Sequence, residues 1–192
     1  MKVNINVPNG KSGIWSVESF TVSEDAAKFE SMRSIFSGGR SVPAGDYKRL
    51  SRSGKCIMSN TPDEIRDLYP FYWTAKDNIL INALGLGVAL KMILQKPEVI
   101  SVTVIEKSQD VINLCAPTYL EDKRVTIICD DAFTYKPPKN VHYDCVWHDI
   151  WDDICSDNLK EMEKLHRKYA KRTEWQGSWC KEQCKRLKSR EF

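Results

Sequence analysis

The sequence predicts an α/β fold with a parallel sheet, preceded by a small N-terminal α+β appendage. From residue 79 onward, strand-like runs at 79–84, 99–105, 125–129 and 143–148 alternate with segments of helical character. The first run is almost uniformly apolar, as expected of a strand that is covered on both faces. Alternation at this spacing favours parallel strands joined by right-handed crossovers.

Two glycines, Gly85 and Gly87, follow the first of these strands and precede a helix-forming stretch. Glycine lets the backbone approach a ligand closely, because it has no Cβ. The amides that open the next helix would point toward that ligand. Leu90 stands where the dinucleotide fingerprint has its third glycine, so this motif alone also fits a tight turn without a ligand.

Residues 1–60 are expected to form the appendage, and residues 61–155 the domain that contains the sheet. The appendage would contain one or two short strands and a helix from 24 to about 36 that begins after a Ser23 cap. A hairpin over 47–58 would turn at Ser53-Gly54.

Residues 156–192 are expected to form a helical, basic tail. Its basic residues include Lys164, Arg167, Lys168, Lys171, Arg172, Lys181, Lys185, Arg186, Lys188 and Arg190. Such a run is most often a solvated helix face, and a nucleic-acid surface is the less frequent alternative. The tryptophans Trp175 and Trp179 would pack on the body of the protein or on a second subunit, so a homodimer is one arrangement to test.

The composition predicts a cytoplasmic protein. No apolar stretch reaches the ~20 residues that cross a bilayer, and the N-terminus lacks the apolar block of a signal peptide. The seven cysteines are interpreted as free thiols in a reducing compartment, since they include no second pair that would complete a zinc site. A net charge of +3 is too small to indicate a nucleic-acid partner.

Acidic residues stand at or after the ends of the later strands, where open α/β sheets bind their ligands. Glu106 lies 19 residues after Gly87, and a carboxylate at this position can accept hydrogen bonds from both hydroxyls of a ribose. Asp131 can accept a bond from an exocyclic amine such as adenine N6, with Ala132 and Phe133 beside the base. Each acid also has a simpler explanation, as a surface residue or as the cap of a turn.

The segment 148–153 is the densest chemical cluster of the chain. Asp149 would act as a general base or amine anchor, with His148 or Asp152 nearby to tune it. Trp147 and Trp151 would stack on a planar substrate or line a pocket for a cation. Alternatively, the acids cap the following helix and the tryptophans lie in the core. A metal site formed by His148, Asp149, Asp152 and Asp153 has no supporting ligand spacing, so no metal is predicted.

These motifs together resemble those of class I S-adenosylmethionine-dependent methyltransferases. The resemblance covers about residues 56–151, and its motifs are Asn82-Ala83-Leu84-Gly85-Leu86-Gly87, Glu106, Asp131-Ala132 and the run from Tyr143 to Asp149. It is closest to the spermidine-synthase-like branch, where Asp63-Glu64 and Tyr69 match a signature helix. It implies a Rossmann-like sheet, shortened at its C-terminus because no fifth strand is expected after Trp151. Compact versions of this kind are most similar to phage or prophage proteins, which would place the chain in a host cytoplasm.

The resemblance implies S-adenosylmethionine as the cofactor. The residues expected to bind it are Leu84, Gly85, Gly87, Glu106, Lys107, Asp131, Ala132 and His148. Asp149 would be the catalytic residue, and Trp147, Trp151 and Asp152 would contact the substrate.

The resulting hypothesis is transfer of a methyl or aminopropyl group to a small amine or hydroxyl acceptor. The glycine loop has Leu86 and Val88 where spermidine synthases carry an acid, so the resemblance does not fix the group that is transferred. A non-catalytic phage protein that binds S-adenosylmethionine or a nucleoside is one alternative. An NAD-dependent oxidoreductase is another, and it would use Gly85, Gly87 and Glu106 in the same way.

Overall fold

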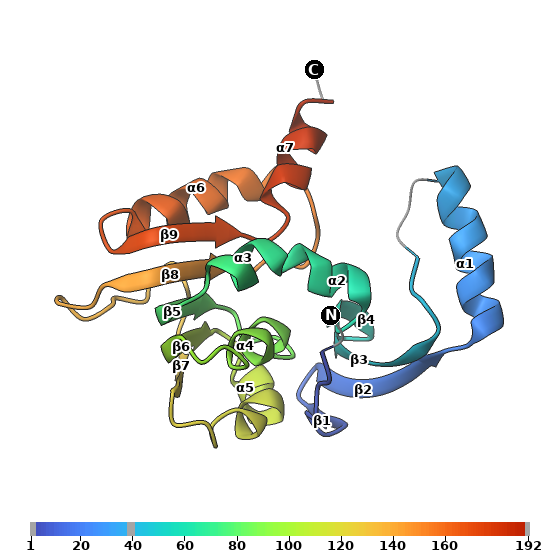
Figure 1. Cartoon of the computed structure of the whole chain (residues 1–192), viewed down its shortest axis with the longest axis horizontal. Coiled ribbons are helices and arrows are strands. Elements are labelled where there is room, and N and C mark those ends of the chain that lie inside the picture. Colours follow the sequence, from blue (N-terminus) through green and yellow to red (C-terminus); the bar gives the residue numbers. More distant parts are fainter. Residues whose placement is uncertain (1–2, 38–40, 191–192) are drawn as a thin grey trace.

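A five-stranded parallel sheet forms the centre of the larger part of the computed structural model, which describes residues 3–37 and 41–190 (Figure 1). The strand order is β7-β6-β5-β8-β9, and every neighbouring pair is parallel. The strands are β5 (Asp77–Asn82), β6 (Val99–Glu106), β7 (Val125–Cys129), β8 (Tyr143–His148) and β9 (Thr173–Ser178). The predicted α/β class with a Rossmann-like parallel sheet is therefore confirmed.

Helices cover both faces of this sheet, which explains why the middle of β5, from Ile79 to Ile81, is apolar and fully buried. Ile79 and Ile81 of β5 pack in the larger core with residues of α3, α4 and α5. Leu80, which points to the opposite face, packs with Tyr169 of α6 in a second core. The helices are α2 (Pro62–Asp67), α3 (Tyr69–Thr74), α4 (Val88–Ile93), α5 (Gln109–Cys115), α6 (Asn158–Tyr169) and α7 (Lys181–Lys188).

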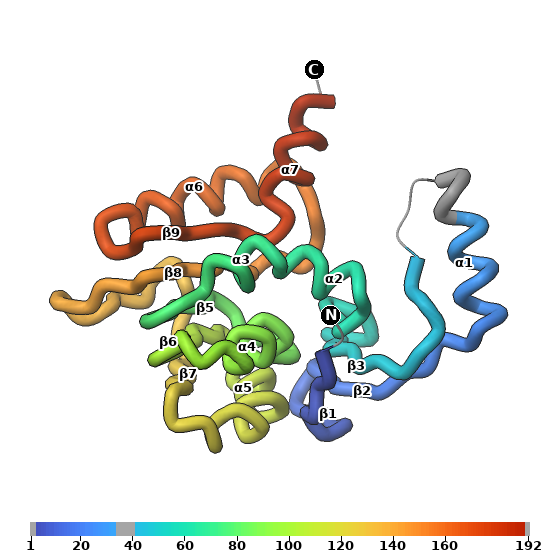
Figure 2. Tube along the Cα trace, viewed as in Figure 1, coloured from blue at the N-terminus to red at the C-terminus, as the bar shows by residue number. Residues whose placement is uncertain are grey.

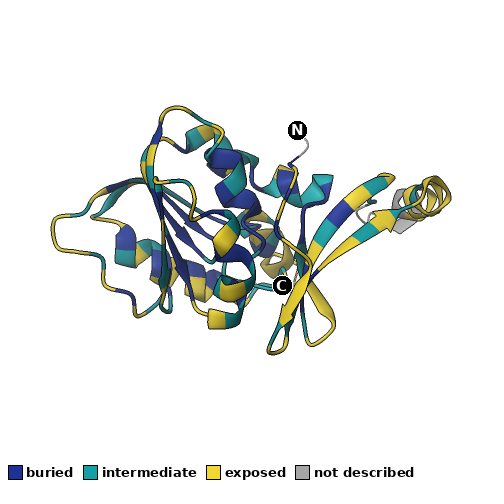
Figure 3. Ribbon diagram, turned by 90° about the horizontal axis from the view of Figure 1, so that it is seen from below, coloured by how far each residue is buried: buried dark blue, intermediate teal, exposed yellow. Residues whose placement is uncertain are grey.

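The N-terminal part forms a separate antiparallel sheet in the order β1-β2-β3-β4. Its strands are β1 (Gly10–Ser12), β2 (Trp15–Val22), β3 (Gly45–Arg52) and β4 (Lys55–Ser59), and α1 (Glu24–Ser37) is inserted between β2 and β3. The hairpin turn at Ser53 and Gly54 has positive φ at both residues, which confirms the predicted turn. Figures 1 and 3 show α1 at the outer end of this sheet and largely exposed, away from the buried parallel strands.

The C-terminal segment differs from the helical tail predicted for residues 156–192. After α6 the chain returns to the sheet as β9, which pairs in parallel with β8, and then ends in α7 (Figure 2). The expectation of no fifth strand is therefore wrong. Trp175 of β9 stacks on Trp147 of β8 with ring centroids 6.4 Å apart, and Trp179 packs against the larger core. Both tail tryptophans therefore pack on the body of the protein.

The described residues contain no helix that is both long enough and apolar enough to span a bilayer. All seven cysteines lie within the described residues, where they are free thiols.

Gly177 should be required for the packing of β9. A Cβ at this position would lie 2.5 Å from Trp175 Cη2 and 2.8 Å from Trp147 Cζ3, and the stacked rings leave little room to move. We expect Gly177→Ala to lower the free energy of unfolding by about 1–3 kcal/mol, as overpacking does elsewhere. Urea denaturation measures this, with Glu174→Ala on the same strand as an exposed control. Equal stability of the two variants would contradict the packing.

Candidate functional site

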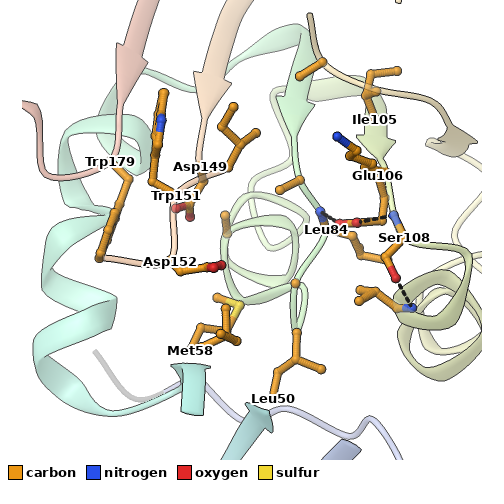
Figure 4. Close-up of a pocket in the computed structure, with 18 of the residues that line it drawn as sticks. Leu50, Met58, Leu84, Ile105, Glu106, Ser108, Asp149, Trp151, Asp152 and Trp179 are labelled. Carbon is orange, nitrogen blue, oxygen red and sulfur yellow. Dashed lines mark hydrogen bonds between the residues drawn. The ribbon is translucent and has the colours of Figure 1, made fainter. Parts of the chain in front are cut away.

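A cavity of about 680 Å³ lies at the carboxyl edge of the parallel sheet, between this edge and the N-terminal sheet (Figure 4). In open α/β sheets this edge binds ligands where the strand order reverses, and here the reversal lies between β5 and β8. The wall from the parallel sheet includes Leu84, Glu106, Asp131 and Asp149. The opposite wall includes Trp15, Leu50, Arg52, Ile57 and Met58 of the N-terminal sheet.

Glu106 joins the ends of β5 and β6 below the cavity. Its Oε2 accepts a hydrogen bond from the Leu84 amide and its Oε1 accepts one from the Ser108 amide, both at 2.8 Å (Figure 4). The residue is only 7% exposed, yet it lines the cavity. Because a carboxylate oxygen has more than one lone pair, each oxygen can also accept a bond from a ligand hydroxyl.

The two glycines of the loop after β5 have different roles. Gly85 lines the cavity with φ of 53°, and a Cβ there would overlap Met58 Sδ. Gly87 does not line it: a Cβ there would overlap the ring of Tyr119, whose hydroxyl donates to the Leu86 carbonyl at 2.6 Å. The sequence suggested ligand contact for both glycines. The structure places Gly85 on the cavity wall and gives Gly87 a packing role.

Asp131 is fixed at the end of the cavity beyond β7. Lys107 Nζ lies 2.8 Å from Asp131 Oδ2, and the Phe133 amide donates to Asp131 Oδ1 at 2.8 Å. These two partners hold the pKa of the Asp131 carboxyl below its usual value, so it is ionised at neutral pH. Lys168 Nζ donates to the carbonyls of Ala132 and Phe133, at 2.7 and 3.1 Å, and thereby fixes the loop beside the aspartate.

Asp149 lies directly after β8 on the same edge. Burial raises the pKa of its carboxyl to about 7, and the nearby carboxylates of Glu64 and Asp67 contribute in the same direction. The Trp147 indole opposes this shift only in part. A carboxyl that titrates near neutral pH can both take up and release a proton there, as a general base requires.

The cavity is rich in negative charge and in aromatic rings. Its described lining residues include the six acids Glu64, Glu106, Asp131, Asp149, Asp152 and Glu161, with Arg52 and Lys107 as the basic residues. Arg52 is paired with Asp152, and its guanidinium lies over the Trp15 ring. The Trp151 indole donates a hydrogen bond from Nε1 to the Glu161 carboxylate at 2.8 Å, and Trp179 also lines the cavity. Carboxylates and aromatic faces both attract cations, so the cavity suits a positively charged ligand.

Most of the residues expected at a site do line this cavity. They are Leu84, Gly85, Glu106, Lys107, Asp131, Ala132, Asp149, Trp151 and Asp152. The structure places Trp147 and His148 in the core instead. Trp147 is stacked on Phe71 and Trp175, with centroids 5.3 and 6.4 Å away, which leaves no ring face for a substrate.

His148 is fully buried and held by polar neighbours on both sides of its ring. Its Nδ1 lies 2.7 Å from Asn82 Nδ2, and its Nε2 lies 3.3 Å from Gln176 Oε1. Burial lowers the pKa of the imidazole to about 3, so the ring is neutral at pH 7. The proposed contact of His148 with a cofactor is therefore not supported, and the residue links β5, β8 and β9.

The sequence did not reveal the residues that the N-terminal sheet contributes. Trp15 and Arg52 are paired neighbours in the β2–β3 register, and Met58 comes from the adjacent strand β4. Glu64 had been noted only as part of a helix motif. It accepts bonds from the Ser59 amide at 2.7 Å and the Ser59 hydroxyl at 2.6 Å, which joins α2 to the end of β4.

No protein-family model and no curated protein matches this sequence. Among solved structures, the chain is similar to an S-adenosylmethionine-dependent methyltransferase from Clostridium acetobutylicum, with 14% identity, a TM-score of 0.42, and coverage of 58% of this chain and 44% of that one. It is similar to the N-methyltransferase NodS from Bradyrhizobium japonicum, with 12% identity, a TM-score of 0.45, and coverage of 58% and 61%. For the methyltransferase SibL the identity is 22%, the TM-score 0.45, and the coverage 59% and 32%. The chain thus spans less than two thirds of each of these proteins.

Glu106→Gln should destabilise the fold. Glutamine offers one carbonyl oxygen where the glutamate accepts two amide bonds, and its own NH₂ group would face one of those donors. We expect a loss of about 1–3 kcal/mol in the free energy of unfolding, the cost of an unsatisfied buried donor. The exposed Glu121→Gln is the control and should stay within about 0.5 kcal/mol of the wild type in the same urea titration. Equal losses for both variants would refute the role of Glu106.

The stability of the fold should depend on pH through Asp149. Its folded-state pKa of about 7 exceeds the ordinary value of 3.8, so its stabilising contribution is complete below about pH 3.8 and is lost as pH rises through 7. Asparagine does not titrate. We therefore expect the stability of Asp149→Asn, relative to wild type, to rise between pH 4 and 7 and then level off. Urea titrations across this range measure the difference, and parallel curves for the two proteins would contradict it.

Proposed function

We propose that this chain binds S-adenosylmethionine in the cavity and transfers its methyl group to a small amine. The observation that carries the proposal is the buried carboxylate of Glu106 beside the Gly85 loop, with the ionised Asp131 at the end of the adjacent strand. A nucleoside-containing ligand needs acceptors for ribose hydroxyls and for a base amine, and these acids offer both.

The residues present fit this cofactor. Gly85 lines the cavity, and its lack of a Cβ lets another group, here the Met58 side chain, lie directly against the loop backbone. Glu106 would hold the ribose and Asp131 the adenine amine, with the Phe133 ring beside the base. The cavity falls in the roughly 300–1,000 Å³ range of small-molecule sites. Its excess of carboxylates favours the positive charge of a sulfonium over a neutral or anionic ligand.

When bound, S-adenosylmethionine supplies a methyl group activated by its sulfonium, so the protein needs mainly to align the acceptor and accept a proton. Asp149 would accept that proton from the amine, and its pKa of about 7 suits it to do so at neutral pH. Trp151 and Trp179 would line the acceptor side of the cavity, which Asp149 also lines.

The charge of the cavity favours an amine over a hydroxyl as the acceptor. An alkylamine arrives as a cation, which the acids Glu64, Asp149 and Asp152 attract, and it must lose a proton before it can attack. A neutral hydroxyl gains nothing from this charge. The same acids would also serve transfer of an aminopropyl group, as in the spermidine-synthase-like branch, and the product distinguishes the two reactions. Methyl transfer from S-adenosylmethionine leaves S-adenosylhomocysteine, whereas aminopropyl transfer needs decarboxylated S-adenosylmethionine as its donor and leaves methylthioadenosine.

Calorimetric titration with S-adenosylmethionine, S-adenosylhomocysteine and NAD tests the proposal. We expect binding of the first two in the micromolar range, weakened about tenfold by Asp131→Asn through loss of one charged hydrogen bond. The control is Glu121→Gln, an exposed acid that does not line the cavity. Asp149→Asn should retain this binding but lose turnover in a screen of small amines. Binding of NAD alone would instead indicate an oxidoreductase, and binding of none of the three would overturn the proposal.

A further inference from the structure

Met58 of β4 lies against the glycine loop, where it holds a backbone amide. The Leu86 N–H donates to Met58 Sδ at 3.1 Å, and the same sulfur occupies the space that a Cβ on Gly85 would take. Figure 4 shows the Met58 side chain pointing from the N-terminal sheet into the cavity. A thioether sulfur is a weak acceptor, so a ligand oxygen would be a better partner for this amide.

The hairpin that carries Met58 is tied across the cavity by two ion pairs. Arg52 of β3 pairs with Asp152, and Lys55 Nζ of β4 lies 2.6 Å from Asp153 Oδ2. Both aspartates belong to the segment between β8 and α6. The Lys55 and Asp153 side chains are 57% and 67% exposed, and an ion pair of this kind typically contributes about 0–1 kcal/mol. The Lys55–Asp153 pair therefore restrains the hairpin only weakly.

We propose that Met58 and the cofactor compete for the glycine loop, so that the cofactor enters only after the β3–β4 hairpin withdraws Met58. This inference rests on the proposed function, because it takes the glycine loop as the cofactor site. Met58 is then a positioning residue. When no ligand is present, it accepts the hydrogen bond of the Leu86 amide and holds the glycine loop in its conformation. The affinity measured for a ligand is reduced by the fraction of molecules in which Met58 blocks the loop.

Association kinetics of S-adenosylhomocysteine with the full chain test this competition. Met58→Ala removes the obstructing side chain, and we expect the association rate to rise about tenfold with a matching fall in Kd. Met58→Leu keeps a side chain of similar volume and should associate at about the wild-type rate. Ile57→Ala is the control, because it removes apolar volume from the same strand and the same cavity wall without contacting the loop amide. Thermal unfolding of each variant checks that it is folded.

The ion pairs provide a second readout. S-adenosylhomocysteine carries no net charge, so added salt should raise its association rate mainly by weakening the two pairs. The double variant Arg52→Gln/Lys55→Gln should associate faster at low salt and lose this salt dependence. Arg49→Gln is the matched control, since Arg49 pairs at 2.8 Å with Glu18 inside the N-terminal sheet and does not bridge the cavity.

The outcomes separate this inference from the proposed function. If Met58→Ala binds S-adenosylhomocysteine no faster than wild type, or more weakly, competition by Met58 is refuted while cofactor binding stands. If the double variant and Arg49→Gln behave alike, the ion pairs do not restrain the hairpin. If neither wild type nor Met58→Ala binds the ligand, the proposed cofactor site itself is refuted.

Discussion

The buried carboxylate of Glu106 is the constraint on which the candidate site depends. It accepts the amides of Leu84 and Ser108 and so fixes the chain after β5 against the chain after β6. Ala83, directly before Leu84, is held at φ of 84°, a conformation that costs an L-residue about 1–2 kcal/mol. The loop keeps this strained shape because Glu106 and the Ala83–Ile105 backbone bond determine it from both sides. Gly85 then faces the cavity because the loop is fixed in this way.

The strands that could be predicted from the sequence are those whose burial gives a local signal. β5 lies between β6 and β8 and is covered on both faces, so each of its inner residues had to be apolar. β9 is an edge strand of intermediate burial, and its Trp175-Gln176-Gly177 sequence has no such pattern. Tertiary packing determines where β9 lies. Gly177 leaves space for the Trp147 ring, and Gln176 forms a hydrogen bond with His148. Neither contact can be inferred from one segment alone.

The same distinction applies to the site. Residues at strand ends, such as Glu106, Asp131 and Asp149, could be found because parallel strands bring their carboxyl ends to one edge. The sequence could not show that Asp149 lines the cavity while its neighbour His148 lies in the core. Both faces of β8 are buried, so the strand has no alternation of polar and apolar residues that would reveal which way each side chain points. The opposite wall was missed entirely. Met58 reaches the cavity only through the way the N-terminal sheet docks on the parallel sheet, for which the sequence offers no spacing rule.

The wall formed by the N-terminal sheet also affects Asp149, the residue on the opposite wall that would accept the proton. Glu64 is bonded to Ser59 at the end of β4, the strand that carries Met58, and its negative charge helps to raise the pKa of Asp149. A movement of the hairpin that shifts Glu64 or admits water would lower this pKa, because both causes of the shift would weaken. Withdrawal of the hairpin from the glycine loop would therefore lower the proton affinity of Asp149 relative to the docked state. The docked antiparallel sheet thus contributes to the raised pKa of a carboxyl at the edge of the parallel sheet.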